Sequence, residues 1–200
     1  SSSQRIATPP RQPAATIIKH TNPCGTGIGS TLAAAYNKAY MADPVSAFGG
    51  IVAVNRVVDA DTARQISEIF IEAVIAPGFE PEATEILTQK KNIRLLAAQM
   101  EQDATKLGFD MKRVTGGILV QDYDLPEKTD LQVVTKRTPT DEELEQLKFA
   151  WKVVKHVKSN AIVVAGKDQT LGIGAGQMNR VGSAGIALCQ AGGQAYRLEN

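Results

Sequence analysis

The 200-residue sequence has few cysteines, no long apolar run and almost no excess of charge of either sign. Its two cysteines, Cys24 and Cys189, lie too far apart in the sequence to suggest a disulfide framework or a CxxC zinc pattern. No apolar run reaches the roughly 18 residues that a membrane span requires. The first residues lack the apolar region of a signal peptide. We therefore expect a cytoplasmic, reduced protein with no membrane partner.

The charge balance predicts no nucleic-acid partner. Lysine and arginine number 22 and aspartate and glutamate 21, which gives a formal net charge of +1. A nearly neutral chain has no global basic field for nucleic acid, although single basic residues could still bind a small anion. Hydrophobic residues make up 43% of the chain, a proportion typical of a protein that buries a core, so we expect one ordinary domain or two small ones.

Short apolar runs alternate with segments of helical periodicity in the first half of the chain. Strands are predicted at 15–18, 51–55, 74–76 and 93–96, and helices at 31–42, 61–73 and 81–88. Asp61 is the expected N-cap of the second helix, and the glycine-containing segment 46–50 is expected to be a loop. Strands that alternate with helices predict an α/β sheet.

The second half of the chain has a different pattern. A strand with a glycine break is predicted at 114–121, and no terminal element is predicted after residue 191. Thr140 and Glu143 fit a capping box, which predicts the start of a long helix. The apolar runs at 160–165 and 170–173 predict a β-hairpin. We divide the chain into a loose leader at 1–12, a first α/β part at 13–125, and a linker, long helix, hairpin and glycine-rich segment of the same domain at 126–200.

Lys19 and His20 form the most reactive-looking pair. They follow the strand predicted at 15–18 and precede 22–25, which is predicted to be a tight turn because it contains proline and glycine. The carboxyl end of a strand is where open α/β sheets place ligands, and histidine carries protons near neutral pH. The pair is therefore either a catalytic base beside an ammonium group or an ordinary, partly exposed strand end.

Cys24 could be a nucleophile activated by His20, a zinc ligand or a packed turn residue. Zinc deaminases need an H-x-E motif followed by P-C-x-x-C. Here Gly27 occupies the position of the second cysteine, and no H-x-E motif is present. We interpret Cys24 as a packed turn residue and expect no zinc site.

The glycine-rich segment Gly172-x-Gly174-x-Gly176 allows two interpretations. The position where a dinucleotide fingerprint has its third glycine is occupied by Gln177. The glycines are either a strand end that packs closely against other backbone, or part of a phosphate site at a helix start that also holds Arg180.

Two further polar residues are singled out by their positions. Asn160 follows a basic helix end and could orient a neutral amide or amine. Glu72 precedes the strand predicted at 74–76, at a helix-to-strand junction, where a carboxylate is either functional or simply solvated.

Six ordered segments resemble one family. They are residues 19–25, 43–50, 72–78, 134–137, 158–161 and 172–180. Together they resemble the transformylase domain of the bifunctional purine biosynthesis enzymes, which combine phosphoribosylaminoimidazolecarboxamide formyltransferase with IMP cyclohydrolase. The resemblance covers about residues 13–190. It implies a cytidine-deaminase-like α/β fold, here incomplete, with a mixed sheet flanked by helices and no catalytic zinc.

The resemblance also implies a reaction in purine (IMP) biosynthesis. A formyl group passes from 10-formyltetrahydrofolate to the 5-amino group of 5-aminoimidazole-4-carboxamide ribonucleotide. His20 would be the base that takes the proton of the attacking amine. Lys19 would stabilise charge and help to position the formyl group, and Asn160 would lie near the reacting groups.

The resemblance also implies which further residues bind the substrates. Phe48 and Gly49 would lie against the substrate, and Gln177 and Arg180 would bind the nucleotide. Glu72 would lie near the folate pterin. The family can also carry potassium, which would be bound near Val157 and Ser159.

Several departures from the family qualify these expectations. The cyclohydrolase domain and the later part of the transformylase are missing, residues 1–12 do not resemble the family, and the resemblance fades over 182–200. We therefore expect an internal fragment. Active sites of the family lie at a homodimer interface, so the complete protein is expected to be a homodimer. The alternative function is a fragment that binds the nucleotide or a partner chain without turnover.

Overall fold

The computed structural model describes residues 12–98, 108–124 and 131–198, and for 193–198 it describes the backbone alone. The chain divides into two compact units. The larger unit contains residues 12–98 and 140–198, and the smaller unit contains the described residues between 108 and 139.

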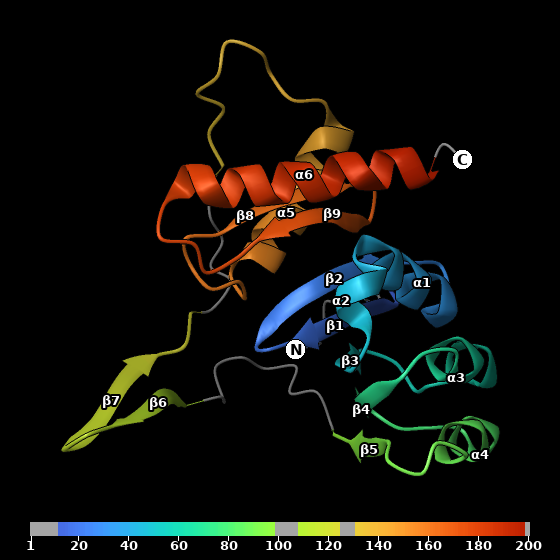
Figure 1. The fold of residues 1–200 in the computed structure, drawn as a ribbon. Coiled ribbons are helices and arrows are strands. Elements are labelled where there is room, and N and C mark those ends of the chain that lie inside the picture. Colours follow the sequence, from blue (N-terminus) through green and yellow to red (C-terminus); the bar gives the residue numbers. More distant parts are fainter. Residues whose placement is uncertain (1–11, 99–107, 125–130, 199–200) are drawn as a thin grey trace, which may run out of the picture. The chain divides into compact units, whose positions relative to one another are not determined.

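A mixed seven-stranded sheet forms the centre of the larger unit (Figure 1). In spatial order its strands are β5 (Arg94–Ala97), β4 (Ile71–Ala76), β3 (Gly50–Val54), β1 (Ala14–Lys19), β2 (Asn22–Ile28), β9 (Gln169–Gly174) and β8 (Ile162–Gly166). Strands β3, β4 and β5 are parallel to one another, and the other neighbours pair antiparallel. The α/β class with a mixed sheet flanked by helices is confirmed.

The first helices close a core over β1, β3 and β4. They are α1 (Leu32–Ala42), α2 (Pro44–Ala47), α3 (Ala60–Ser67) and α4 (Pro81–Thr88). Alternate strand residues such as Ile17, Val52 and Val74 have no exposed surface, and Ile66 of α3 and Leu87 of α4 pack into the same cluster. This alternation follows from the strand period of two, which directs every second side chain to one face.

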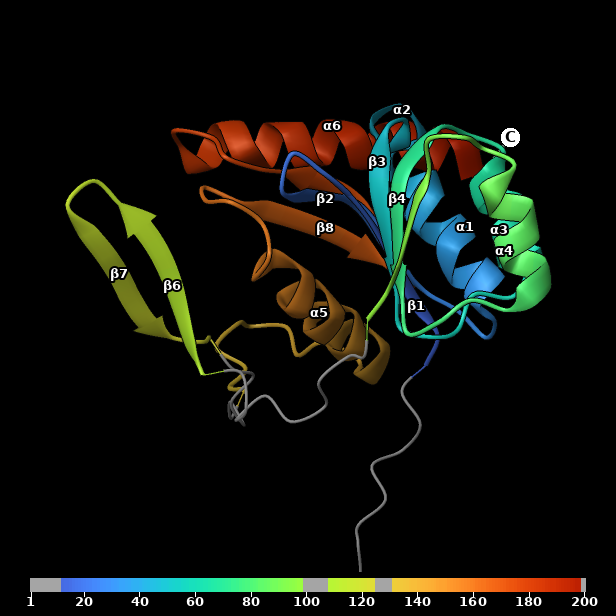
Figure 2. The same ribbon diagram turned by 90° about the horizontal axis from the view of Figure 1, so that it is seen from below.

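Two later helices cover β8 and β9 from opposite sides (Figure 2). Helix α5 (Asp141–Val154) packs on the face that carries Ile173, and α6 (Arg180–Leu198) packs on the face that carries Gly172 and Gly174. A Cβ atom on either glycine would lie 2.0 Å from a backbone oxygen of α6. The structure thus gives these two glycines a packing role, because only glycine permits so close an approach.

Side-chain caps explain where three helices begin. The side chains of Thr31, Asp59 and Thr140 accept hydrogen bonds from backbone N–H groups in the first turns of α1, α3 and α5. The capping box of Thr140 and Glu143 is confirmed. The prediction of Asp61 as an N-cap was wrong, because the cap lies two residues earlier, at Asp59.

The structure corrects several element boundaries in the first half. Segment 22–25 is not a turn but the start of β2, because the chain already reverses at His20 and Thr21. Segment 46–50 is not simply a loop, since α2 covers its first two residues. The helix predicted to reach residue 73 ends at Ser67, and β4 begins at Ile71. Ile69 and Phe70 lie in the connection between them, and the apolar residues from Ile71 onwards belong to the buried strand rather than to a helix face.

The smaller unit contains a two-stranded hairpin of β6 (Phe109–Val114) and β7 (Gly117–Asp122). The single strand predicted at 114–121 was therefore wrong, because the glycine break is the turn of this hairpin. Every residue of both strands is exposed.

The last helix is longer than the sequence predicts. Helix α6 extends to Leu198, whereas no terminal element was predicted after residue 191. Within the described ranges, no helix is long and apolar enough to cross a membrane.

Candidate active site

The residues singled out from the sequence gather at one end of the seven-stranded sheet. Strands β1 and β9 end there, whereas β2, β3, β4, β5 and β8 begin there. The register shows this directly, since Ile18 pairs with Ile51 at the start of β3. The rule that ligands bind at the carboxyl ends of parallel strands therefore does not locate this site. The parallel strands β3, β4 and β5 present their amino ends to it.

The turn between β1 and β2 consists of His20 and Thr21, which have φ angles of 50° and 70°. Lys19 and Asn22 pair on either side of it. Two central residues with positive φ are typical of the tightest hairpin turns, which prefer asparagine and glycine there. A β-branched residue such as Thr21 is strained in this conformation. Such strain persists only where neighbouring contacts hold the backbone, and it is frequent at functional sites.

The Lys19 side chain connects this turn to the segment between α2 and β3. Its Nζ donates a hydrogen bond of 2.8 Å to the backbone oxygen of Phe48. An ammonium group carries three donors, so two N–H groups of Lys19 remain for another acceptor. Lys19 is thus held in place and still able to contact an oxygen of a bound molecule.

Phe48 and Gly49 form a platform beside Lys19. Gly49 has a φ of 70°, and its N–H donates to the oxygen of Phe70 over 2.8 Å. The rings of Phe48 and Phe70 are 5.5 Å apart, yet Phe48 remains 58% exposed. An exposed ring supported from behind offers a flat apolar surface to a planar ligand.

Asn160 and Gln177 hold two chain segments together at the same end of the sheet. The N–H of Asn160 donates to the oxygen of Gln177 over 3.1 Å, and the N–H of Gln177 donates back over 3.3 Å. The Asn160 side-chain Nδ2 donates to the same oxygen over 3.0 Å. The side chain of Gln177 donates to the oxygen of Ala175 over 3.0 Å. Both side chains therefore already donate within the protein.

One side-chain contact links these two clusters. The Oδ1 atom of Asn22 accepts a hydrogen bond of 3.0 Å from the N–H of Lys158. Asn22 thereby connects the turn that carries His20 to the segment that carries Asn160. No sequence signal marks this role of Asn22, although the residue lies within the first motif, directly before Pro23.

Arg180 is the first residue of α6 and is exposed. In the described part of the chain, no ion pair involves its guanidinium group. The Oδ1 of Asn179 accepts from the N–H of Gly182 over 2.7 Å, so the start of the helix is already partly capped. The structure thus leaves the charge of Arg180 available to an anion.

Glu72 lies in β4 rather than at a helix-to-strand junction. Its carboxylate forms an ion pair of 2.8 Å with Arg94 of the neighbouring strand β5, and both side chains are about half exposed or more. Opposite charges on adjacent strands stabilise a sheet modestly. The observed contact therefore gives Glu72 a structural partner, and its expected place near a pterin stays a prediction.

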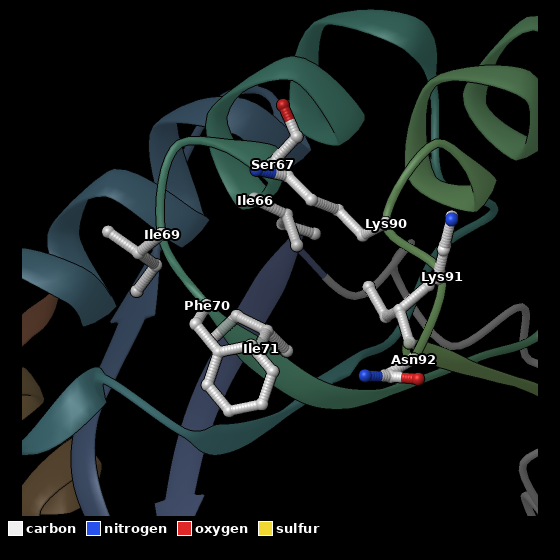
Figure 3. A pocket seen from close by; sticks show the side chains of 9 residues that line it. Ile66, Ser67, Ile69, Phe70, Ile71, Lys90, Lys91 and Asn92 are labelled. Atoms are coloured by element: carbon white, nitrogen blue, oxygen red, sulfur yellow. The ribbon is translucent and has the colours of Figure 1, made fainter.

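A pocket of about 170 Å³ opens near Phe70 (Figure 3). It lies between the segment that connects α3 to β4 and the loop that leads from α4 to β5. Isoleucines supply most of its apolar lining, and Lys90 and Lys91 lie at its polar side. Phe70 links this pocket to the Phe48 platform through the ring contact.

Cys24 is a half-buried residue of β2, not a turn residue. Its Sγ lies 3.7 Å from the oxygen of Ser46. Burial and the nearby carboxylate of Asp43 raise the pKa of this thiol to about 11, although Lys19 opposes the shift. A thiol that stays protonated at neutral pH is a poor nucleophile. Among the described residues, no group of three or more His, Cys, Asp or Glu could hold a metal ion.

The backbone near Val157 and Ser159 meets only part of the requirement for potassium. No hydrogen bond is seen to the carbonyl oxygens of these two residues in the described part of the chain, whereas the oxygen of Lys158 accepts from Gly176 over 2.7 Å. Two free carbonyls are too few to replace the hydration shell of a cation. A potassium ion here would need further oxygen ligands.

Comparison with known proteins gives the family. The sequence model described as AICARFT/IMPCHase bienzyme matches residues 2–190. The chain belongs to this family. The match begins within the segment 1–12, so the expectation that this leader does not resemble the family was wrong for most of it.

Bacterial relatives of the AICARFT/IMPCHase family extend this result. The chain is 57% identical over 183 residues to the bifunctional purine biosynthesis protein PurH of Oceanobacillus iheyensis, covering 90% of the chain and 36% of that protein. It is 58% identical over 187 residues to PurH of Anoxybacillus flavithermus, covering 92% of the chain and again 36% of that protein. The chain thus spans about a third of the length of these curated relatives.

Proposed function

We propose that this site takes part in formyl transfer from 10-formyltetrahydrofolate to the 5-amino group of 5-aminoimidazole-4-carboxamide ribonucleotide. The observation that carries the proposal is the strained turn on which His20 stands exposed beside Lys19. A proton acceptor and an ammonium group stand on neighbouring residues, and the lysine donates to the backbone oxygen of Phe48, whose ring is exposed. Family membership favours this chemistry over other uses of the same groups.

The acceptor amine is a poor nucleophile, because its lone pair is delocalised into the imidazole ring. His20 takes a proton from this nitrogen as the bond between nitrogen and the formyl carbon forms. The formyl oxygen then carries negative charge, which a free N–H of Lys19 stabilises. The tetrahedral intermediate expels the folate nitrogen, and that nitrogen receives from His20 the proton that the amine released. Lys19 also helps to position the formyl group.

The surrounding residues bind the two substrates. The nucleotide base lies against Phe48 and Gly49, and Asn160 lies near the reacting groups. Gln177 and Arg180 bind the nucleotide, with Arg180 as the anion partner. Glu72 lies near the pterin of the folate, and its ion pair with Arg94 leaves one carboxylate oxygen for this contact.

We also propose that the complete protein is a cytoplasmic homodimer and that potassium contributes to its structure. The apolar side chains exposed on the present chain, such as Trp151 and Leu147, support association with further protein surface. The carbonyl oxygens of Val157 and Ser159 would hold part of a potassium site.

The two histidines of the chain provide a matched test. In a full-length protein that contains this segment, His20→Ala is expected to lower formyl transfer by about 10²–10⁴-fold, because it removes the general base. His156→Ala changes a histidine at the end of α5 and should leave the rate within about twofold. Steady-state kinetics measure both. Equal rates for the two variants would contradict the mechanism.

The second candidate function is nucleotide binding without turnover, favoured by the free charge of Arg180 beside the junction of Asn160 and Gln177. A thermal melt of the chain, with and without the ribonucleotide, tests it. Ligand at about 100 times its Kd should stabilise the fold by about 2.7 kcal/mol. Arg180→Gln should remove most of this shift. A melt unchanged by the nucleotide would contradict binding by this chain alone.

A further inference from the structure

Asn22 connects two segments that are remote in the sequence. It is the first residue of β2, and it pairs with Lys19 across the turn of His20 and Thr21. Its Oδ1 accepts from the N–H of Lys158 over 3.0 Å, across 136 residues of sequence. Among the described residues, this is the side-chain hydrogen bond that joins the His20 turn to the Asn160 segment.

The segment that Asn22 contacts is held from its other side by the connection between β9 and α6. The oxygen of Lys158 accepts from Gly176 over 2.7 Å, and Asn160 exchanges two backbone hydrogen bonds with Gln177. Lys158 therefore has its carbonyl bound to one neighbour and its N–H bound to Asn22. Loss of the Asn22 amide would leave that N–H without its acceptor and would free one side of the segment.

The turn itself needs such an anchor. Both of its residues have positive φ, a conformation that relaxes unless surrounding contacts hold it. On one side, Lys19 is anchored to the backbone of Phe48. On the other side, the anchor is Asn22. His20 thus stands between two fixed points, one in the first half of the sheet and one in the second.

We propose that Asn22 is a positioning residue that fixes His20 relative to Asn160 without touching the substrate. The proposal rests on the proposed function, because the separation of the two residues affects a rate only if both act on one reaction. A displacement of about 1 Å between reacting groups can cost up to about a hundredfold in rate.

Asn55 supplies a matched control at the opposite end of the sheet. Its Oδ1 accepts from the backbone N–H of Ala14 over 2.8 Å, and its Nδ2 donates to the oxygen of Gln12 over 2.9 Å. Asn55→Ala therefore removes the same kind of bond, and one more, away from the site. Asn22→Ala removes the proposed anchor, and Asn22→Asp keeps an oxygen that can accept from Lys158. The three variants therefore separate a positioning effect from a general loss of stability.

The first measurement is amide hydrogen exchange and NMR chemical shift in the present chain. In Asn22→Ala, exchange at the Lys158 amide should quicken about tenfold, and signals of the His20 ring and the Asn160 amide should shift. Asn22→Asp should restore both, and Asn55→Ala should change neither. Unchanged exchange and unchanged shifts in Asn22→Ala would overturn the proposal.

The second measurement is steady-state kinetics in a full-length protein that contains this segment. Asn22→Ala should lower kcat about tenfold or more with a smaller change in KM, and Asn22→Asp should recover most of kcat. An equal loss of kcat in Asn55→Ala would overturn the positioning role. If Asn22→Ala and His20→Ala both leave kcat unchanged, the proposed function fails. The exchange and shift measurements then still decide whether Asn22 anchors the turn.

Discussion

The two halves of the larger unit differ in how completely they bury their apolar side chains. In the half built on β1, β3 and β4, residues such as Ile17 and Leu87 have no exposed surface. In the half built on β8 and β9, the buried cluster consists of Val153, Val157 and Ile173, which retain 6–8% exposure. Its helices also leave apolar side chains exposed, which include Leu147, Trp151, Ile186 and Leu188.

Because of this difference, one part of the candidate site lies on a well-packed core, and the other part lies on a half that buries little apolar surface. Lys19, His20 and Phe48 lie at the edge of the closed core. Asn160 and Arg180 belong to the half with little buried surface, where local stability is expected to be lower. The geometry of the whole site therefore depends on the few hydrogen bonds that join the halves.

Matched isoleucine truncations should show this contrast most strongly. Ile17→Ala removes a fully buried side chain from the large core and should cost about 2–5 kcal/mol of unfolding free energy. Ile173→Ala removes the same atoms from the small cluster, whose partly exposed neighbours can relax, and should cost about 2 kcal/mol or less. Urea denaturation of the chain measures both. Equal costs would show that the two halves are equally closed.

The close packing of α6 on β9 offers a second test within the weaker half. In Gly174→Ala, the new Cβ would lie 2.0 Å from the backbone oxygen of Ser183, so the helix must shift, at a cost of about 1–3 kcal/mol. Gly176→Ala places its Cβ in open space and pays only for its positive φ, about 1 kcal/mol. Urea denaturation should give Gly174→Ala a lower free energy of unfolding than Gly176→Ala. The reverse order would exclude close packing as the reason for Gly174.

The sequence predicts the strongly patterned elements and misses the backbone reversal that shapes the site. The strand at 15–18 and the helix at 81–88 are confirmed, because buried residues in them follow the periods of strand and helix. Pro23 and Gly25 are usual turn residues and predict a turn at 22–25. The chain instead turns at His20 and Thr21 rather than at the asparagine and glycine that such turns prefer, so tertiary contacts must hold the turn.

Long-range contacts explain the rest of what the sequence could not give. The candidate residues belong to separate sequence motifs, and only the register of the sheet brings them to one end. The link between Asn22 and Lys158 spans 136 residues and leaves no periodic signal. Likewise, the partner of Glu72 lies on a neighbouring strand, so its ion pair is visible only in the fold.

Raised pKa values of Cys24 and Tyr36 predict a loss of stability at alkaline pH. The pKa of Cys24 is raised from 9.0 to about 11, and burial also raises the pKa of Tyr36. The unfolded chain releases the Cys24 proton at lower pH than the folded chain. The stability due to the protonated thiol is thus complete below pH 9 and declines as the pH rises toward 11.

Urea midpoints between pH 8 and pH 11 measure this decline. Cys24→Ala should flatten part of the pH dependence, whereas Cys189→Ala, which changes an exposed residue of α6, should leave it unchanged. An equally steep decline in Cys24→Ala would assign the effect to other groups, with Tyr36 the next to be replaced.

The smallest expected effect concerns an unsatisfied buried hydroxyl group in the closed core. Tyr36 of α1 is buried in the core cluster, and its hydroxyl has no hydrogen-bond partner in the described part of the chain. A buried hydroxyl without a partner costs desolvation energy, so Tyr36→Phe should leave stability unchanged or raise it by up to about 1 kcal/mol. The stacking on Tyr40 should survive, because both rings remain. A loss of stability in Tyr36→Phe would instead show that an internal water binds this hydroxyl, so that the closed half contains a hydrated site as well as apolar packing.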